Sequence, residues 1–198
     1  MVTRCKKSFI NYNFTMLKRY EKFLKDFDKK LKKYFTEQKE HICCKEGCAG
    51  CCEVGDYPFS QLEMMYIMEG FKKLPVDLRK QIKNNLDNVK NNRHSEHFYY
   101  QCPFLINKKC AVYKYRGITC RTFGLAYLIN KKTKQVKIPQ CSNEGLNFSK
   151  VFDGNEISIE PIKENLDLPS VINSKLAKNH KLEFGEIRSL VNWFPDNQ

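Results

Sequence analysis

Apolar side chains recur at steps of three and four residues between Phe14 and Phe35, with lysines and other polar residues between them. This periodicity predicts an amphipathic helix over residues 14–39 that buries one face and turns a lysine-rich face to solvent. Ser60 and Glu63 match the capping box that begins a helix. We expect further helices over residues 60–71, 78–90, 169–178 and 186–194.

Two pairs of short β-like runs flank polar turns. The first pair flanks Asn107–Lys109 and the second flanks residues 130–134, so both predict hairpins. A further strand is expected over residues 157–159. Together these patterns predict a mainly helical α+β fold, in which a cysteine-rich metal-binding core with two small β-hairpins is flanked by helices. The expected parts are a basic amphipathic helix over residues 1–40, a cysteine-cluster metal-binding domain over 41–145 and a C-terminal helical extension over 146–198 packed on the same core.

Five of the ten cysteines lie within the ten residues Cys43–Cys52. Thiols at such short spacings cannot all satisfy the geometry of disulfides with one another. Thiolates are the ligands that zinc and iron–sulfur centres prefer, so this density predicts a metal centre. We find no signal-peptide pattern and no uncharged apolar stretch long enough to cross a membrane, so we expect a cytoplasmic protein with no membrane span. Clustered cysteines in that reducing compartment are typical of metal sites.

Eight cysteines are the candidate metal ligands, enough for two four-thiolate sites or for one cluster with extra thiols. They are Cys44, Cys48, Cys51, Cys52, Cys102, Cys110, Cys120 and Cys141. Two residues separate Cys48 from Cys51, a spacing at which a tight turn can direct both sulfurs to one ion. Cys51 and Cys52 are adjacent, so we infer that they serve different metals or opposite sides of one polynuclear centre.

The run Cys44…Cys48-x₂-Cys51-Cys52 is followed by Cys102-Pro-Phe-Leu, then Cys110-x-Val-Tyr, and then Arg116…Cys120-Arg121. This order resembles the bacterial and archaeal YkgJ-type cysteine-cluster proteins, a family described as a zinc- or iron-chelating domain. The resemblance extends over residues 43–141 and implies a metal-chelating domain, with zinc, iron or an iron–sulfur cluster as the cofactor. The same cysteines are similar to part of the flagellin lysine methylases, for which an iron–sulfur centre has been proposed.

The chain departs from the family pattern in one place. Three residues, not two, separate Cys44 from Cys48, which leaves open whether Cys43 or Cys44 is the first ligand. Arg116 and Arg121 flank Cys120 and are candidates to donate N–H bonds to thiolate sulfur, with surface ion pairs as the alternative. His41, two residues before the cluster, is a candidate substitute ligand.

The formal net charge is +13, and 28 of the 35 basic residues are lysines. Eight metal-bound thiolates would remove much of that charge, so the excess alone does not establish a polyanion partner. Three function classes remain. The first is a zinc- or iron-binding protein, the second an iron–sulfur enzyme or accessory related to the flagellin lysine methylases, and the third a zinc-stabilised basic module that binds nucleic acid. Beyond the metal ion, the role of the N-terminal helix stays open: its pattern favours packing on its own domain, with binding to a protein partner or a membrane surface as the alternative.

Overall fold

The computed structural model describes residues 3–93 and 98–194, with side chains from residue 14 onward. Within those ranges helices dominate and strands form only short antiparallel pairs, so the expected mainly helical α+β fold is confirmed. The α-helices are α1 (Thr3–Glu37), α2 (Gly50–Glu53), α3 (Gln61–Lys72), α4 (Val76–Asn91), α5 (Ile118–Thr122), α6 (Leu168–Ile172) and α7 (Lys175–Asn179). The 3₁₀ helices are η1 (Lys39–His41), η2 (Tyr113–Tyr115), η3 (Gln140–Glu144) and η4 (Leu190–Trp193).

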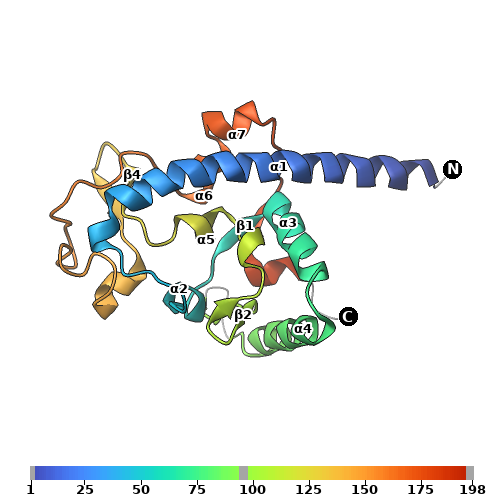
Figure 1. Ribbon diagram of the computed structural model, residues 1–198, viewed down its shortest axis with the longest axis horizontal. Helices are drawn as coiled ribbons and strands as arrows, with labels where there is room; N and C mark the ends of the chain where they lie inside the picture. Colours follow the sequence, from blue (N-terminus) through green and yellow to red (C-terminus); the bar gives the residue numbers. More distant parts are fainter. Residues whose placement is uncertain (1–2, 94–97, 195–198) are drawn as a thin grey trace.

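Helix α1 is the main scaffold, with 35 residues that span about 52 Å at 1.5 Å per residue. Figure 1 shows it lying across one side of the molecule, with its first turns extending beyond the other elements. Its buried side chains recur at three- and four-residue steps and are Met16, Tyr20, Phe23, Leu24, Phe27 and Leu31. The predicted amphipathic helix is therefore confirmed, and it begins at Thr3, earlier than the pattern indicated.

The capping box at the start of α3 also holds α5 in place. The Ser60 hydroxyl accepts a hydrogen bond from the Glu63 backbone N–H, and the Glu63 carboxylate accepts one from the Ser60 N–H at 2.8 Å. The other carboxylate oxygen accepts the Ile118 N–H at 2.7 Å, at the first residue of α5. A Cβ at Gly117 would lie 2.6 Å from that same oxygen, so glycine allows this close approach. Glu63 is fully buried, and its hydrogen bond to the first residue of α5 holds in place the helix that carries Cys120.

Three two-stranded antiparallel sheets occur in the described part of the chain. Both predicted hairpins are confirmed, as β2 (Leu105–Ile106) with β3 (Lys109–Cys110) and as β4 (Tyr127–Asn130) with β5 (Gln135–Lys137). The β2–β3 turn places Asn107 and Lys108 at φ 49° and 62°, the left-handed pair typical of two-residue hairpins. The third sheet pairs β1 (Pro58–Ser60) with β6 (Ile187–Ser189), and the sequence pattern did not indicate it.

Two hydrophobic clusters meet at Tyr115. The first joins the buried face of α1 to α3, α6 and α7. The second joins α3 and α4 to β2 and η4. Cys102, Cys110 and Cys120 pack against the second cluster, so this part of the core is one wall of the cysteine region.

Three expected elements are wrong. Residues 157–159 form no strand, because Ile157 makes only an isolated bridge to Phe152. The expected helix over 169–178 is two short helices, since Ser174 ends the first segment by capping α7 with its side chain. Residues 186–194 form β6 and η4 instead of a helix, because β6 pairs with β1 and so takes an extended backbone.

No helix among the described residues has the length and apolar character needed to span a membrane.

Candidate metal centre

The cysteine region begins where α1 ends. After η1 the chain forms a loop through Cys43, Cys44 and Cys48, and then the single turn of α2, which carries Cys51 and Cys52. In Figure 1, α2 lies beside the β2–β3 hairpin. The Cys102 N–H donates to the Cys52 carbonyl at 2.7 Å and so joins the start of the hairpin segment to α2.

The nine cysteines from Cys43 to Cys141 are all free thiols in the structure. Cys43, Cys44 and Cys48 are exposed, and the remaining six are partly buried. These thiols are therefore available for metal ligation, oxidation or alkylation to different degrees, with the loop before α2 the most accessible part.

An inner group contains Cys51, Cys102, Cys110 and Cys120. Burial raises the pKa of the Cys102 thiol to about 12, and the neighbouring Cys110 and Cys51 thiolates act in the same direction. Burial also raises the pKa of Cys120, with further contributions from Cys102, Cys110 and Cys51. Cys51, Cys102 and Cys110 thus all disfavour ionisation of Cys120, and Cys51 also disfavours ionisation of Cys110, which is the electrostatic condition a bound cation would relieve.

An outer group contains Cys44, Cys48 and Cys141. Burial raises the pKa of Cys141, and the Cys44 and Cys48 thiolates raise it further. Burial likewise raises the pKa of Cys44, with contributions from Cys48, Cys51 and Cys43. Helix α2 contacts η3, which carries Cys141, so the outer group closes over the side of α2 away from the hairpin.

The adjacent Cys51 and Cys52 have their sulfur atoms 3.9 Å apart. Two thiolates on one tetrahedral zinc, each with a Zn–S bond of about 2.3 Å, lie about 3.8 Å apart. The two sulfurs are therefore spaced suitably for a single ion, although the sequence hypothesis assigned them to different metals or to opposite sides of one centre. The Cys52 thiol is also the main cause of the raised pKa of Cys51, ahead of burial.

The thiols are gathered without being closed around an ion. Across residues 3–93 and 98–194, no three or more His, Cys, Asp or Glu side chains lie close enough together to hold a metal as they stand. The donor chemistry of both groups fits zinc or iron, which bind thiolates, but side-chain rotation is needed to bring the sulfurs to bonding distance. Cys43, Cys44 and Cys48, in the loop before α2, are the exposed members of the two groups and their flanks.

Asn147 is a contributor that the sequence pattern did not reveal. Its side chain is buried, and its Oδ1 accepts the Cys43 N–H at 2.7 Å. Its Nδ2 donates to the Cys44 sulfur at 3.1 Å and to the Gly124 carbonyl at 3.2 Å. This hydrogen bond lowers the pKa of Cys44 against the effect of burial and distinguishes Cys44 from Cys43. Only the fold brings residue 147 to the cysteine loop, so no local signal could have found it.

The two expected supporting arginines have different partners. The Arg116 guanidinium lies near Cys51 and Cys110, and it lowers the pKa of both thiols against burial and neighbouring sulfur. Its Nε is buried without a hydrogen-bond partner, while its guanidinium stacks 4.0 Å from the Tyr113 ring. Arg121 instead binds Asp28 of α1 at 2.6 and 2.8 Å, so its expected hydrogen bond to thiolate sulfur is replaced by an ion pair.

Two ion pairs join the β2–β3 hairpin to the cysteine loop. Lys109 pairs with Glu46 at 3.1 Å, and Lys108 pairs with Glu53. Both pairs are exposed and therefore contribute little to stability, but they fix the hairpin near α2. Tyr57 lies beside the inner thiols, where burial and the Cys51 and Cys120 thiolates raise its pKa.

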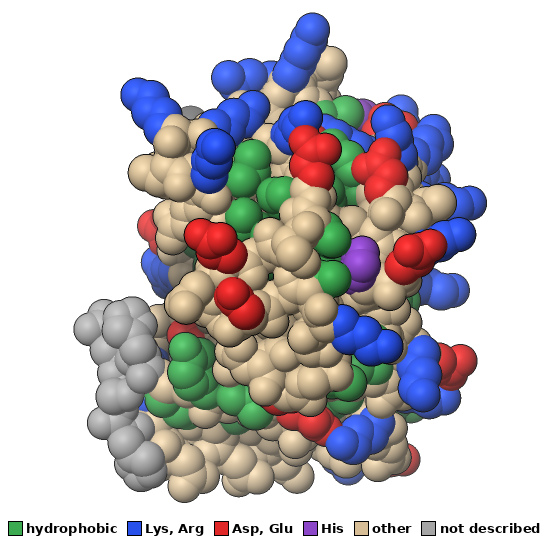
Figure 2. Space-filling view, turned by 90° about the vertical axis from the view of Figure 1, so that its left-hand side faces the viewer, with side chains coloured by type: hydrophobic (Ala, Val, Ile, Leu, Met, Phe, Trp, Pro, Cys, Tyr) green, Lys and Arg blue, Asp and Glu red, His purple; other side chains and the backbone are tan. Residues whose placement is uncertain are grey.

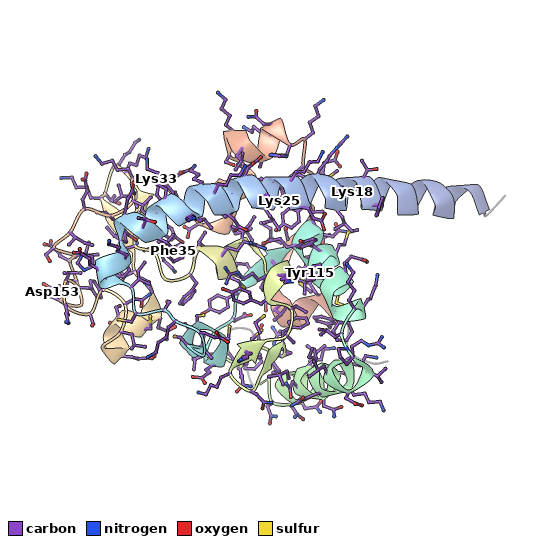
Figure 3. All side chains as sticks on the ribbon, viewed as in Figure 1. Lys18, Lys25, Lys33, Phe35, Tyr115 and Asp153 are labelled. Atoms are coloured by element: carbon purple, nitrogen blue, oxygen red, sulfur yellow. The ribbon has the colours of Figure 1, made fainter. Side chains whose placement is uncertain are left out.

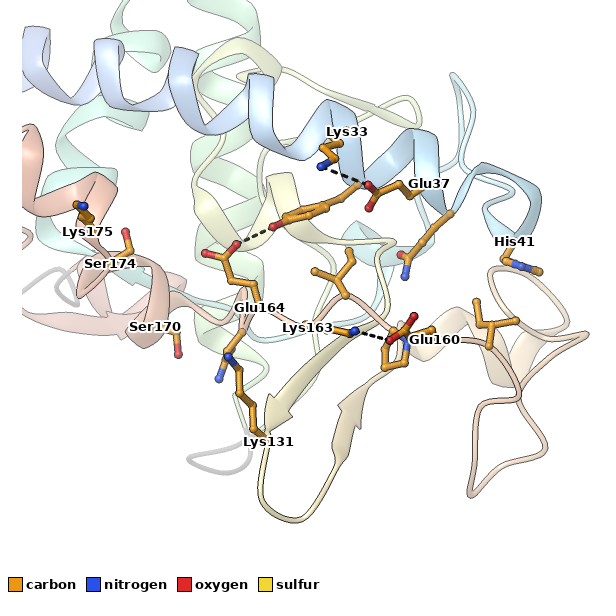
Figure 4. A pocket seen from close by; sticks show the side chains of 16 residues that line it. Lys33, Glu37, His41, Lys131, Glu160, Lys163, Glu164, Ser170, Ser174 and Lys175 are labelled. Atoms are coloured by element: carbon orange, nitrogen blue, oxygen red, sulfur yellow. Dashed lines mark hydrogen bonds and ion pairs between the residues drawn. The ribbon is translucent and has the colours of Figure 1, made fainter.

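The candidate substitute ligand His41 stacks on Phe148, with the ring centroids 5.9 Å apart. It lies at the edge of a cleft of about 1000 Å³ between the end of α1 and the segment from Ile159 to Lys175 (Figure 4). The charges in this cleft are largely paired, since Lys163 binds Glu160 at 2.7 Å and the Tyr34 hydroxyl donates to Glu164 at 2.7 Å. The His41 ring thus packs against Phe148 and lines this cleft.

Comparisons with models of known protein families, with curated proteins and with solved structures find no match to this chain, so its function is argued from its own residues and their geometry.

Proposed function

We propose that the protein is a metal-binding protein whose cysteines hold zinc or iron. The observation that carries the proposal is the convergence of thiols from separate segments: the loop with α2, the β2–β3 hairpin, α5 and η3. Their mutual effects on thiol pKa support proximity between residues that are up to about a hundred positions apart in the sequence. Convergence of thiols without a disulfide is typical of thiolate metal sites.

In the proposal the two groups bind separately. Cys51, Cys102, Cys110 and Cys120 form the inner, four-thiolate site, and Cys52 adds a sulfur at its edge. The outer site uses Cys44, Cys48 and Cys141. Three described thiols leave one coordination position in the outer site for Cys52 or water, and an open position of this kind is a property of exchangeable or catalytic sites.

The structure supports Cys44 over Cys43 as the first ligand. Asn147 donates to the Cys44 sulfur, whereas only the backbone N–H of Cys43 is bound. A donor aimed at a thiolate fixes its orientation and favours its ionised form. Arg116 would act in the same way at the inner site, where its positive charge already favours the thiolates of Cys51 and Cys110.

A bound ion would cross-link segments that are distant in the sequence, and its binding energy would add to folding stability. The thiols themselves must lose protons on binding. Because burial raises the pKa of Cys102 and Cys120, they are protonated at neutral pH in the metal-free protein, so binding releases protons and weakens as the pH falls.

The direct test is metal and acid-labile sulfide content, with a visible spectrum, for protein purified without oxygen. One or two zinc ions in a colourless protein, or near-stoichiometric iron in a coloured one, would support the proposal. Protein that contains neither metal and takes up neither Zn²⁺ nor Fe²⁺ after reduction would refute it.

The adjacent exposed cysteines offer a matched pair of variants for the outer site. Cys44→Ser should lose the metal of the outer site, while Cys43→Ser should keep the full metal content. Cys102→Ser should remove the inner metal and leave the outer one. Equal loss in the Cys43 and Cys44 variants would exclude the assignment of Cys44 as first ligand.

A further inference from the structure

The solvent face of α1 carries a stripe of lysines on the side toward α7. Lys22, Lys25, Lys29 and Lys32 follow one another at steps of three and four residues, so they lie on one face of the helix over about 15 Å. All four are exposed. Figure 3 shows Lys18, Lys25 and Lys33 spaced along the same helix, which extends this basic character beyond the stripe at both ends.

The acidic residues on α1 do not neutralise this stripe. Asp28 is engaged by Arg121 from the protein body at 2.6 Å. Asp26 pairs with Lys29 at 3.3 Å and with His180 at 3.1 Å. In the described part of the chain, the side chains of Lys22, Lys25 and Lys32 make no hydrogen bond or ion pair. The fold therefore leaves three lysines of the stripe without an ion-pair partner.

Glu21 is the remaining acidic residue of this part of α1. It lies four residues before Lys25 and is therefore a neighbour of the stripe, at the edge toward α3, where its charge also acts on Tyr66 and Lys73. No ion pair joins it to Lys25 in the described part of the chain. The stripe therefore has one acidic neighbour along that edge, and its lysines remain in excess.

Helix α7 adds further cations beside the stripe. Lys175, Lys178 and Lys181 are exposed on α7 and just after it. Between the two helices a shallow groove of about 600 Å³ is lined by Lys22, Lys25, Lys32, His180 and the Asp26–Lys29 pair, with Asp28 at its edge. Figure 1 places α7 alongside α1 on the side away from the cysteine region, and Figure 2 shows Lys and Arg side chains projecting from that upper edge.

We propose that this lysine stripe, defined by Lys22, Lys25, Lys29 and Lys32 with the adjoining lysines of α7, binds the phosphate backbone of nucleic acid. Lysines act as point charges for phosphates and read no bases, so the contact would be independent of sequence. A regular row of cations along a rigid helix suits a polyanion with regularly spaced charges.

An anionic membrane is the less suitable partner, because a helix that lies on a bilayer inserts its apolar face. The apolar face of α1 is already occupied by the core, where Tyr20, Phe23 and Phe27 are buried. Between Lys22 and Lys32 the exposed side therefore offers charge without a large apolar side chain to insert. The exposed Phe14 lies about two turns before the stripe, with the Lys18 ammonium 4.4 Å from its ring centroid. This surface is separate from the thiol groups, so the proposal does not depend on metal binding.

The test measures fluorescence anisotropy of a labelled 20-base-pair DNA duplex at increasing salt with full-length protein. Lys22→Ala/Lys25→Ala removes two unpaired lysines of the stripe while keeping good helix formers. Lys80→Ala/Lys83→Ala is the matched control, since these two exposed lysines have the same three-residue spacing on α4, away from α1.

Each lost phosphate contact reduces the slope of log K against log salt by about 0.9 for duplex DNA, so the stripe variant should have a slope shallower by about 1.8. The control should keep the slope of the unmodified protein. Equal loss in the two variants would attribute binding to net charge and overturn the proposal. Absence of duplex binding at 50 mM salt, or binding only to vesicles that contain phosphatidylserine, would also overturn it. Circular dichroism of each variant verifies that α1 is intact.

Discussion

Asn147→Asp is the sharpest test of how the fold supports the outer thiols. The substitution keeps the shape of the side chain and the oxygen that accepts the Cys43 N–H at 2.7 Å. It replaces the Nδ2 donor, which binds the Cys44 sulfur at 3.1 Å and the Gly124 carbonyl at 3.2 Å, with an oxygen. A carboxylate would then face the Gly124 carbonyl and, in the metal-bound protein, the Cys44 thiolate, neither of which can donate a hydrogen bond to it.

The expected effect on stability follows from the two lost hydrogen bonds. Each contributes about 1 kcal/mol, so the variant should be less stable by about 2 kcal/mol, and by more if the carboxylate stays ionised at this buried position. The effect on metal affinity is separate. Loss of a partner that orients a ligand costs 10- to 100-fold in affinity, or about 1.4 to 2.7 kcal/mol.

The assay combines urea unfolding of the metal-free protein with zinc titration against a chromophoric chelator. Asn165→Asp is the matched control, because Asn165 also donates to a carbonyl, that of Ile129 at 3.0 Å, and accepts a backbone N–H, that of Asp167 at 2.8 Å. The control should lose stability and keep zinc affinity. Unchanged zinc affinity in the Asn147 variant, or an equal loss in the control, would refute the role of Asn147 at Cys44.

Three further predictions test the surroundings of the inner thiols. Burial raises the pKa of Cys102 from its ordinary value of 9.0 to about 12, so the unfolded chain loses the thiol proton at a lower pH than the folded protein does. The metal-free protein should therefore become less stable as the pH rises from about 9 toward 12. Urea midpoints that stay constant over this range would contradict this prediction. Glu63→Ala should cost about 3 kcal/mol in urea unfolding, because it leaves the buried N–H groups of Ser60 and Ile118 without an acceptor, and a cost below about 1 kcal/mol would contradict this reasoning. Gly117→Ala should lower the free energy of unfolding by about 1 to 3 kcal/mol, since its Cβ would lie 2.6 Å from the Glu63 carboxylate, and calorimetry that shows an unchanged midpoint would mean that the site can expand.

Local patterns predicted the elements whose structure depends on nearby residues. The three- and four-residue steps in α1 and the Ser60–Glu63 capping box need only neighbours within a turn or two, and both are present. The Asn107–Lys108 turn is likewise specified by the short run on each side. These features follow from helix periodicity and turn geometry, which a sequence displays directly.

The failure at residues 186–194 has its cause in a distant partner. The apolar residues Ile187, Leu190 and Val191 suggested a helix, but pairing with β1 makes the first part a strand, while Leu190 and Val191 are buried in η4. Pairing with a strand more than a hundred residues away cannot be read from a local pattern.

The candidate site likewise combines features that the local sequence displays with features that depend on distant partners. The cysteines were evident from their density, but their separation into inner and outer groups depends on how the loop, hairpin, α5 and η3 meet. The partners of Arg121 and Cys44, which are Asp28 and Asn147, lie 93 and 103 residues away. Such contacts are a property of the fold and carry no signature in either segment alone.

The pairing of β1 with β6 has a consequence for the order in which the chain folds. Trp193 donates to the Phe59 carbonyl across 134 residues, and Lys30 of α1 binds Glu164 across the same separation. Contacts between segments so distant in sequence form slowly, because a long loop must close before they are made. During synthesis, α1 and the cysteine loop therefore emerge long before the segments that cover them. A nascent chain would therefore expose free thiols and part of the apolar face of α1 until the segments that carry Glu164, α6 and α7 have been synthesised.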